Sequence, residues 1–120
     1  MAIGATLTVV LSGGSTVLNR INQDNYASEF FYKDSTRSAT LRIRHTTTTP
    51  KGDVPAYDRH NVEIVETFFK TLTDPEFSRK CYFVIEQLPS DDSVANFDGL
   101  CDLSIATSNA FLKDLMAWIS

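Results

Sequence analysis

The sequence contains few of the residues that build metal centres and covalent active sites. It has two cysteines and two histidines in 120 residues, at unrelated spacings, so no zinc-binding pattern is present. Glycine-rich phosphate loops and the serine motif of hydrolases are absent as well. We therefore expect no catalytic residues, no metal, no cofactor and no small-molecule substrate.

The sequence also lacks the signals of membrane insertion and export. No apolar run approaches the roughly 20 residues that span a bilayer, and Met1–Gly4 lacks the basic segment of a signal peptide. We expect no membrane partner. Cys81 and Cys101 each lie in an apolar stretch, which predicts reduced, buried thiols of a cytosolic protein.

Length and composition indicate one globular domain that covers residues 1–120. Hydrophobic residues make up 42% of the chain and charged residues 22%, which is typical of a folded protein. The formal net charge is -4. The acidity belongs to residues 89–120, where five aspartates accompany one lysine, whereas residues 1–88 are balanced. The net charge therefore does not exclude a nucleic-acid partner for the first segment.

Alternating apolar and polar residues predict strands over most of the chain. Residues 5–11 and 16–21 flank the turn Ser12–Ser15 and predict an N-terminal hairpin within residues 1–22. Further strands are expected within residues 26–88, at 26–33, 39–49, 59–70 and 79–88.

The period changes to three and four residues after Pro89, which predicts two helices within residues 91–119. The acidic segment Ser90–Ser93 is a plausible helix start, and Thr107–Asn109 predicts a break between the two helices. Strands followed by helices give an α+β fold with an antiparallel sheet.

Two short helices cover only part of one sheet face, so a single copy would leave apolar surface in water. Dimerisation, with the helices of one copy on the sheet of another, would cover it. The expected dimer-interface residues are the apolar helix positions Phe97, Phe111, Leu112, Leu115, Trp118 and Ile119.

The polar face of the sheet is the candidate for binding chemistry. Thr40, Arg42, Arg44 and Thr46 alternate on one strand, with Leu41, Ile43 and His45 on its other face. Arg59, Asn61, Glu63 and Thr67 form a second row, and Tyr82 adds an aromatic ring. Guanidinium groups, hydroxyls and an aromatic ring suit phosphates and unpaired bases. A solvated sheet face with no ligand has the same composition, so the pattern alone leaves both interpretations open.

The remaining polar residues have simpler explanations. His45 falls on the apolar face of its strand, where a hydrogen-bonded structural histidine is expected, and His60 is expected to be solvated. Asp91 and Asp92 fit a helix N-terminus better than a catalytic carboxylate pair.

The order of these segments resembles the coat proteins of leviviruses, the single-stranded RNA bacteriophages. The N-terminal hairpin is followed by Tyr26–Phe30, Ser38–Thr46, Asp58–Glu66 and Lys80–Glu86, and then by two helices that begin near Asn96. The resemblance covers nearly the whole chain in element order, although each motif is short.

The resemblance implies an intertwined homodimer in which two sheets join edge to edge and the helices of each copy clasp the other. Dimers would assemble into an icosahedral shell in the host cytoplasm, with helices outward and the sheet facing the genome. The dimer would also bind a hairpin of the viral RNA and repress replicase translation.

The family's RNA-facing positions correspond here to residues of three strands. Glu63 stands where some members have a basic residue, and Val84 stands where some have a polar one, so specific hairpin recognition is less well supported than general RNA binding. The loop near Leu72–Ser78 is short and lacks cysteine, so no disulfides between subunits are expected there. The predicted RNA-binding residues are Thr40, Arg42, Arg44, Thr46, Asn61, Glu63, Tyr82 and Glu86.

Two other interpretations remain open from the sequence. A non-viral dimeric RNA-binding regulatory module could use the same sheet without forming shells. A small enzyme would need a concave pocket with His45 or His60 beside a carboxylate.

Overall fold

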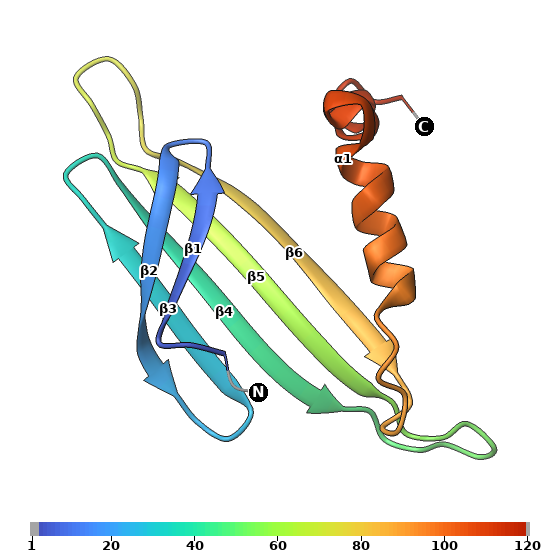
Figure 1. Ribbon diagram of the computed structural model, residues 1–120. Helices are drawn as coiled ribbons and strands as arrows, with labels where there is room; N and C mark the ends of the chain where they lie inside the picture. Colours follow the sequence, from blue (N-terminus) through green and yellow to red (C-terminus); the bar gives the residue numbers. More distant parts are fainter. Residues whose placement is uncertain (1–2, 120) are drawn as a thin grey trace. The chain divides into compact units, whose positions relative to one another are not determined.

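Six strands follow one another along the chain and pair in the same order, as an antiparallel meander (Figure 1). The computed structural model describes residues 3–119. Met1 and Ser120, the predicted limits of the domain, lie outside these described residues, as does Ala2. The strands are β1 (Thr6–Leu11), β2 (Gly14–Gln23), β3 (Ala27–Lys33), β4 (Arg37–Thr47), β5 (Asp58–Phe68) and β6 (Phe77–Gln87).

All six predicted strands are present, with shifted ends. The strand predicted at 39–49 runs from Arg37 to Thr47, because Arg37 is buried and continues the ladder opposite Phe68. The predicted hairpin is β1–β2, and it belongs to the same six-stranded sheet rather than standing apart from it.

A shift of register in β2 lets the hairpin turn over the sheet. Residues 14–19 of β2 pair with β1, whereas residues 19–23 pair with β3, and the irregularity falls between Arg20 and Asn22. Such irregularities bend a strand and increase its twist. Figure 1 shows β1 and β2 crossing in front of the strands β3–β5.

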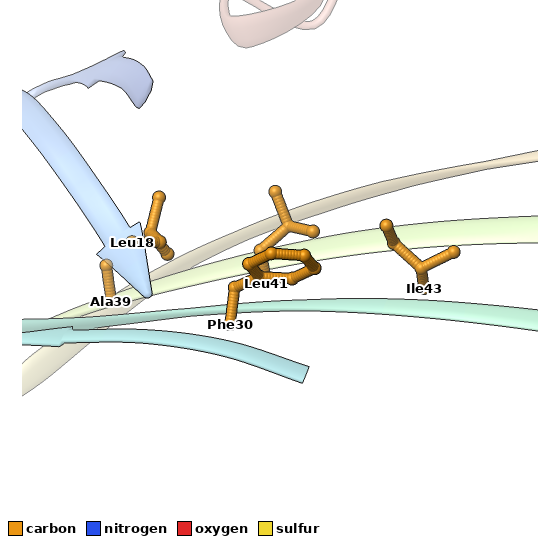
Figure 2. Packing of buried hydrophobic residues seen from close by; sticks show 5 residues of the cluster. All are labelled: Leu18, Phe30, Ala39, Leu41 and Ile43. Carbon is orange, nitrogen blue, oxygen red and sulfur yellow. The ribbon is translucent and has the colours of Figure 1, made fainter. Parts of the chain in front are cut away.

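The core lies between the hairpin and the sheet face that it covers. Leu18 of β2 and Phe30 of β3 are fully buried and pack with Ala39, Leu41 and Ile43 (Figure 2). The β4 members are two residues apart, so they share one face, as the alternation predicts. The opposite face of the sheet carries none of these core residues.

A buried ion pair fastens the tip of the hairpin to this core. Arg37 Nη1 lies 2.9 Å from Glu66 Oε2 and donates to Thr16 Oγ1 at 2.8 Å. The same Glu66 carboxylate accepts the Gly13 N–H at 3.2 Å and the Ser12 hydroxyl. Every strong charge in this clamp therefore has a partner, which a buried ion pair requires.

Glycine is required at the hairpin tip because of the clamp. A Cβ at Gly13 would lie 2.5 Å from Arg37 Nε. Since that guanidinium is held by Glu66 and Thr16, it has no room to move aside.

The C-terminal segment Pro89–Ser120 is a second compact unit, and within its described residues it forms one helical element, α1 (Ala95–Met116). The backbone leaves helical geometry from Ala106 to Asn109, and Thr107, Ser108 and Asn109 have left-handed φ values. The predicted break is therefore at the expected residues, but two separate helices are not confirmed. Over residues 3–119, no helix is long and apolar enough to cross a membrane.

Two local predictions are wrong. The helix begins at Ala95 rather than in the Ser90–Ser93 segment, and its N-cap residue Val94 offers no side-chain cap. The cysteines are not buried, since Cys81 is exposed and Cys101 is only half-buried. Both are free thiols.

Arg37→Ala should destabilise the fold by about 3–5 kcal/mol, because it leaves Glu66 buried without a partner. Arg42→Ala is the matched control: its side chain is 44% exposed and Glu63 keeps Arg44 and Lys80 as partners, so the cost should stay within about 1 kcal/mol. Urea denaturation at one fixed protein concentration measures both. Equal losses for the two variants would show that the clamp does not hold the hairpin.

The β3–β4 turn gives the fold an acid-sensitive contact. The Thr36 and Arg37 N–H groups and the Tyr32 hydroxyl donate to Asp34 and hold the pKa of its carboxyl far below the ordinary value of 3.8. Folding lowers this pKa, so the stabilisation is complete above the ordinary value and is lost as the pH falls below it.

Asp34→Asn should therefore flatten the dependence of stability on acid. Between about pH 4 and pH 2, the urea midpoint of the variant should fall less than that of the wild type. Parallel curves for the two proteins would mean that other carboxylates carry the acid response.

Candidate nucleic-acid interface

The sheet face that points away from the hairpin is mostly polar, and about half of its side chains are exposed. We call it the open face, and its residues alternate with the core residues along β3–β6. By the strand registers it comprises Ala27, Glu29, Phe31, Lys33, Ser38, Thr40, Arg42, Arg44, Thr46, Arg59, Asn61, Glu63, Val65, Thr67, Ser78, Lys80, Tyr82, Val84 and Glu86.

All eight residues predicted to bind RNA lie on the open face. Register places Arg42 opposite Glu63, and Glu63 opposite Tyr82, in one row across three strands. The next row contains Arg44 and Asn61. Thr46 and Glu86 lie on either side of Arg59 in a third row. The structure therefore brings the predicted residues together on one surface.

Glu63 is the electrostatic centre of this surface. Its carboxylate lies 3.4 Å from Arg42 Nη1, 3.7 Å from Lys80 Nζ and 4.0 Å from Arg44 Nη2. The Glu63 side chain is 14% exposed, whereas the three cations are about half exposed. One carboxylate thus gathers three basic groups while their outer sides remain open to solvent.

Two further acidic residues pair with the same basic rows. Glu29 Oε1 lies 3.4 Å from Arg42 Nη2, and Glu86 Oε2 lies 3.0 Å from Arg59 Nε. The open face carries five basic side chains against three acidic ones, so it keeps two positive charges in a chain that is acidic overall. This excess favours an anionic ligand.

Tyr82 supplies an accessible ring beside these charges. It is 64% exposed, and Lys80 Nζ lies 5.7 Å from its ring centre. Asn61 adds an amide oxygen that is buried without a hydrogen-bond partner, so a reoriented amide could bind a donor on a ligand. A hollow of about 160 Å³ lies beside Glu29, Arg42 and Arg44.

Lys80, Glu29 and Lys33 were missed as site residues by the sequence analysis. Lys80 is two residues from Tyr82 on β6, so the alternation that selected Tyr82 could have selected Lys80 as well. Glu29 and Lys33 become visible only through the register of β3 against β4.

The histidines form a pair on the other side of the sheet. His45 and His60 face each other across β4 and β5, with their Nδ1 atoms 2.9 Å apart. The expected hydrogen bond of His45 is thus present, with His60 as its partner, and His60 is exposed as expected. No group of three potential metal ligands occurs in the part of the chain from residue 3 to 119.

The predicted dimer-interface residues lie in or after the helical element and are largely uncovered in a single chain. Phe97 is half-buried, whereas Phe111, Leu112 and Leu115 are 37–45% exposed. Trp118 is 95% exposed and follows the helix with a left-handed φ. No residue described in α1 is buried.

Residues 4–88 match the family model of the coat protein of phage phiCb5. The chain belongs to this coat protein family. The match ends one residue after β6, so it covers the whole sheet with its hairpin and both sheet faces. Family membership confirms the resemblance to RNA phage coat proteins and identifies a structural protein of the virion capsid.

A solved structure of a virus-like particle has a similar fold. The chain resembles the virus-like particle of bacteriophage AVE019, with a TM-score of 0.52, 9% sequence identity, and coverage of 88% of this chain and 85% of that chain. At this identity the likeness concerns the fold alone. No curated protein sequence matches the chain. Coat protein membership favours a capsid role over the non-viral regulatory module and the small enzyme.

Proposed function

We propose that this coat protein forms homodimers that assemble, in the bacterial cytoplasm, into an icosahedral shell around a single-stranded RNA genome. The open face binds the RNA inside the shell. The same face of the dimer binds an RNA hairpin and thereby represses translation.

The observation that carries this proposal is the segregation of the two sheet faces. The hairpin and its clamp occupy one face, and the open face presents Arg42, Arg44 and the ring of Tyr82 to solvent. Capsid proteins need an anion-binding surface for the genome. The five aspartates of 89–120 belong to the other compact unit, and residues 1–88 by themselves carry as many basic as acidic side chains.

Arg42 and Arg44 supply the phosphate contacts in this proposal. They are two residues apart on β4, so their side chains emerge on one face about 7 Å apart. Both reach Glu63 in the free protein. A phosphate must compete with that carboxylate, so binding is moderate for each copy and depends on the many copies of a shell.

Base contacts would come from Tyr82 and Asn61. An exposed tyrosine ring stacks on an unpaired base with a stabilisation of about 1–3 kcal/mol and little sequence preference. The amide of Asn61, whose oxygen has no partner, adds a hydrogen-bonding group that discriminates between bases. A looped-out base of an RNA hairpin presents both the ring face for stacking on Tyr82 and an edge for a hydrogen bond to Asn61.

Dimer formation would cover the apolar surface of the C-terminal segment. Leu112, Leu115 and Trp118 expose large apolar areas that a stable soluble protein covers with a partner. A second copy of the chain is the partner that a capsid supplies in equal number.

Expression of the protein alone tests the capsid assignment. Electron microscopy should show uniform hollow particles, and nuclease treatment should leave host RNA protected inside them. If only dimers form across a range of salt and pH, shell assembly fails while the dimer and the RNA face remain to be tested separately.

Variants of the open face should change RNA affinity in opposite directions. Arg42→Ala with Arg44→Ala should weaken binding and reduce the slope of log affinity against log salt by about 0.7 for each lost phosphate contact. Glu63→Gln should strengthen binding, because it releases three cations. Filter binding at several salt concentrations measures both effects.

Glu76→Gln is the matched control for Glu63→Gln, because it also removes one negative charge, but from the β5–β6 loop outside the open face. It should leave RNA affinity nearly unchanged. Wild-type affinity in the double arginine variant would show that the open face is only a solvated surface.

A further inference from the structure

β6 is an open sheet edge along its full length. All eleven residues pair with β5 without a register shift, and within residues 3–119 no strand pairs with its other side (Figure 1). The strand contains no proline or bulge, two devices that keep a sheet edge from pairing, and its charged residues include both signs, Arg79, Lys80 and Glu86. Tyr82 and Val84 expose apolar surface along it.

Symmetry restricts how two copies can pair through this edge. If both open faces are to lie on one side of a joined antiparallel sheet, the twofold axis must be perpendicular to that sheet. Residues directly opposite each other then share a face, and one residue of β6 lies opposite its own copy. The pairing is therefore defined by that single central residue.

We propose that two copies pair through β6 with Phe83 on the twofold axis; this rests on the proposed dimer and defines its register. Lys80 then lies opposite Glu86 of the partner subunit, on the open face. Tyr82 then lies opposite the partner's Val84 on that face. On the other face, Cys81 meets the partner's Ile85. Each of these three central pairs joins either opposite charges or two apolar side chains, which stabilises an antiparallel pair.

Neighbouring registers lack this complementarity. With Tyr82 on the axis, Lys80 would lie opposite the partner's Val84. With Val84 on the axis, Tyr82 would lie opposite the partner's Glu86. With Cys81 on the axis, Glu86 would lie opposite the partner's Glu76, a like-charge pair.

The ion pairs within each copy extend across this seam. Glu86 already contacts Arg59 at 3.0 Å, and Lys80 contacts Glu63 at 3.7 Å. Joining Lys80 to the partner's Glu86 gives a row of alternating charges that runs from the basic rows of one copy to those of the other. The edge thereby favours a second copy of itself over a strand that has no acid opposite Lys80.

Two variants with complementary charges test the register. Lys80→Glu alone places two like-charge pairs in its homodimer, and so does Glu86→Lys alone. When the two proteins are unfolded together and refolded, both pairs of the mixed dimer are attractive. Native mass spectrometry should show mixed dimers in at least about tenfold excess over homodimers. Contacts within each copy, such as Arg59 with residue 86, are the same in both kinds of dimer and cancel.

A statistical mixture of the three dimers would overturn the register while leaving dimerisation intact. The absence of any dimer from the wild-type protein, measured by analytical ultracentrifugation, would instead contradict the proposed function.

Disulfide formation gives an independent test in a Cys101→Ser background. Phe83→Cys should form a covalent dimer on mild oxidation, because opposite Cα atoms in an antiparallel pair are about 4.5–5.5 Å apart, within disulfide range. The Cys101→Ser protein without the Phe83 substitution keeps only Cys81. In the proposed register this cysteine lies opposite the partner's Ile85, four residues from the partner's Cys81, so no covalent dimer should form. A covalent dimer through Cys81, or none through residue 83 in an intact dimer, would place a different residue on the axis.

Discussion

The buried contact between Arg37 and Glu66 determines how the surfaces of this coat protein are used. It holds the tip of the β1–β2 hairpin against one sheet face through Ser12, Gly13 and Thr16. Because the hairpin occupies that face, the core forms beneath it. The opposite face is left without apolar cover, and there the chain places five basic side chains.

The same arrangement leaves the structure incomplete as a single copy. The hairpin covers the β3–β5 part of its face and reaches β6 at Arg79, which donates to the Ser12 hydroxyl at 3.3 Å. The helical segment exposes Leu115 and Trp118. In the proposed shell, other copies of the chain would cover these surfaces. The proposed RNA face, dimer seam and shell therefore depend on one another through the shared sheet.

The strands could be predicted because alternation is a local property of the sequence. Their ends could not, and Arg37 shows why: a buried arginine has the sequence pattern of an exposed one, and its partner Glu66 is 29 residues away. The RNA candidates were placed on one face correctly, since a period of two fixes the face. Glu63 was recognised as a departure from the family pattern, but its contacts with three cations depend on register across β4, β5 and β6. Cys81 was predicted to be buried because apolar neighbours do not reveal that a strand lies at a sheet edge.

Amide hydrogen exchange along β6 tests most directly the claim that a second copy completes the sheet. In an isolated chain, every second N–H of residues 77–87 points away from β5 and should exchange rapidly. In the native assembled protein, the account predicts that these amides exchange as slowly as those of β5. Rapid exchange at alternate β6 positions in the assembled protein would show that this edge is open and would contradict the account.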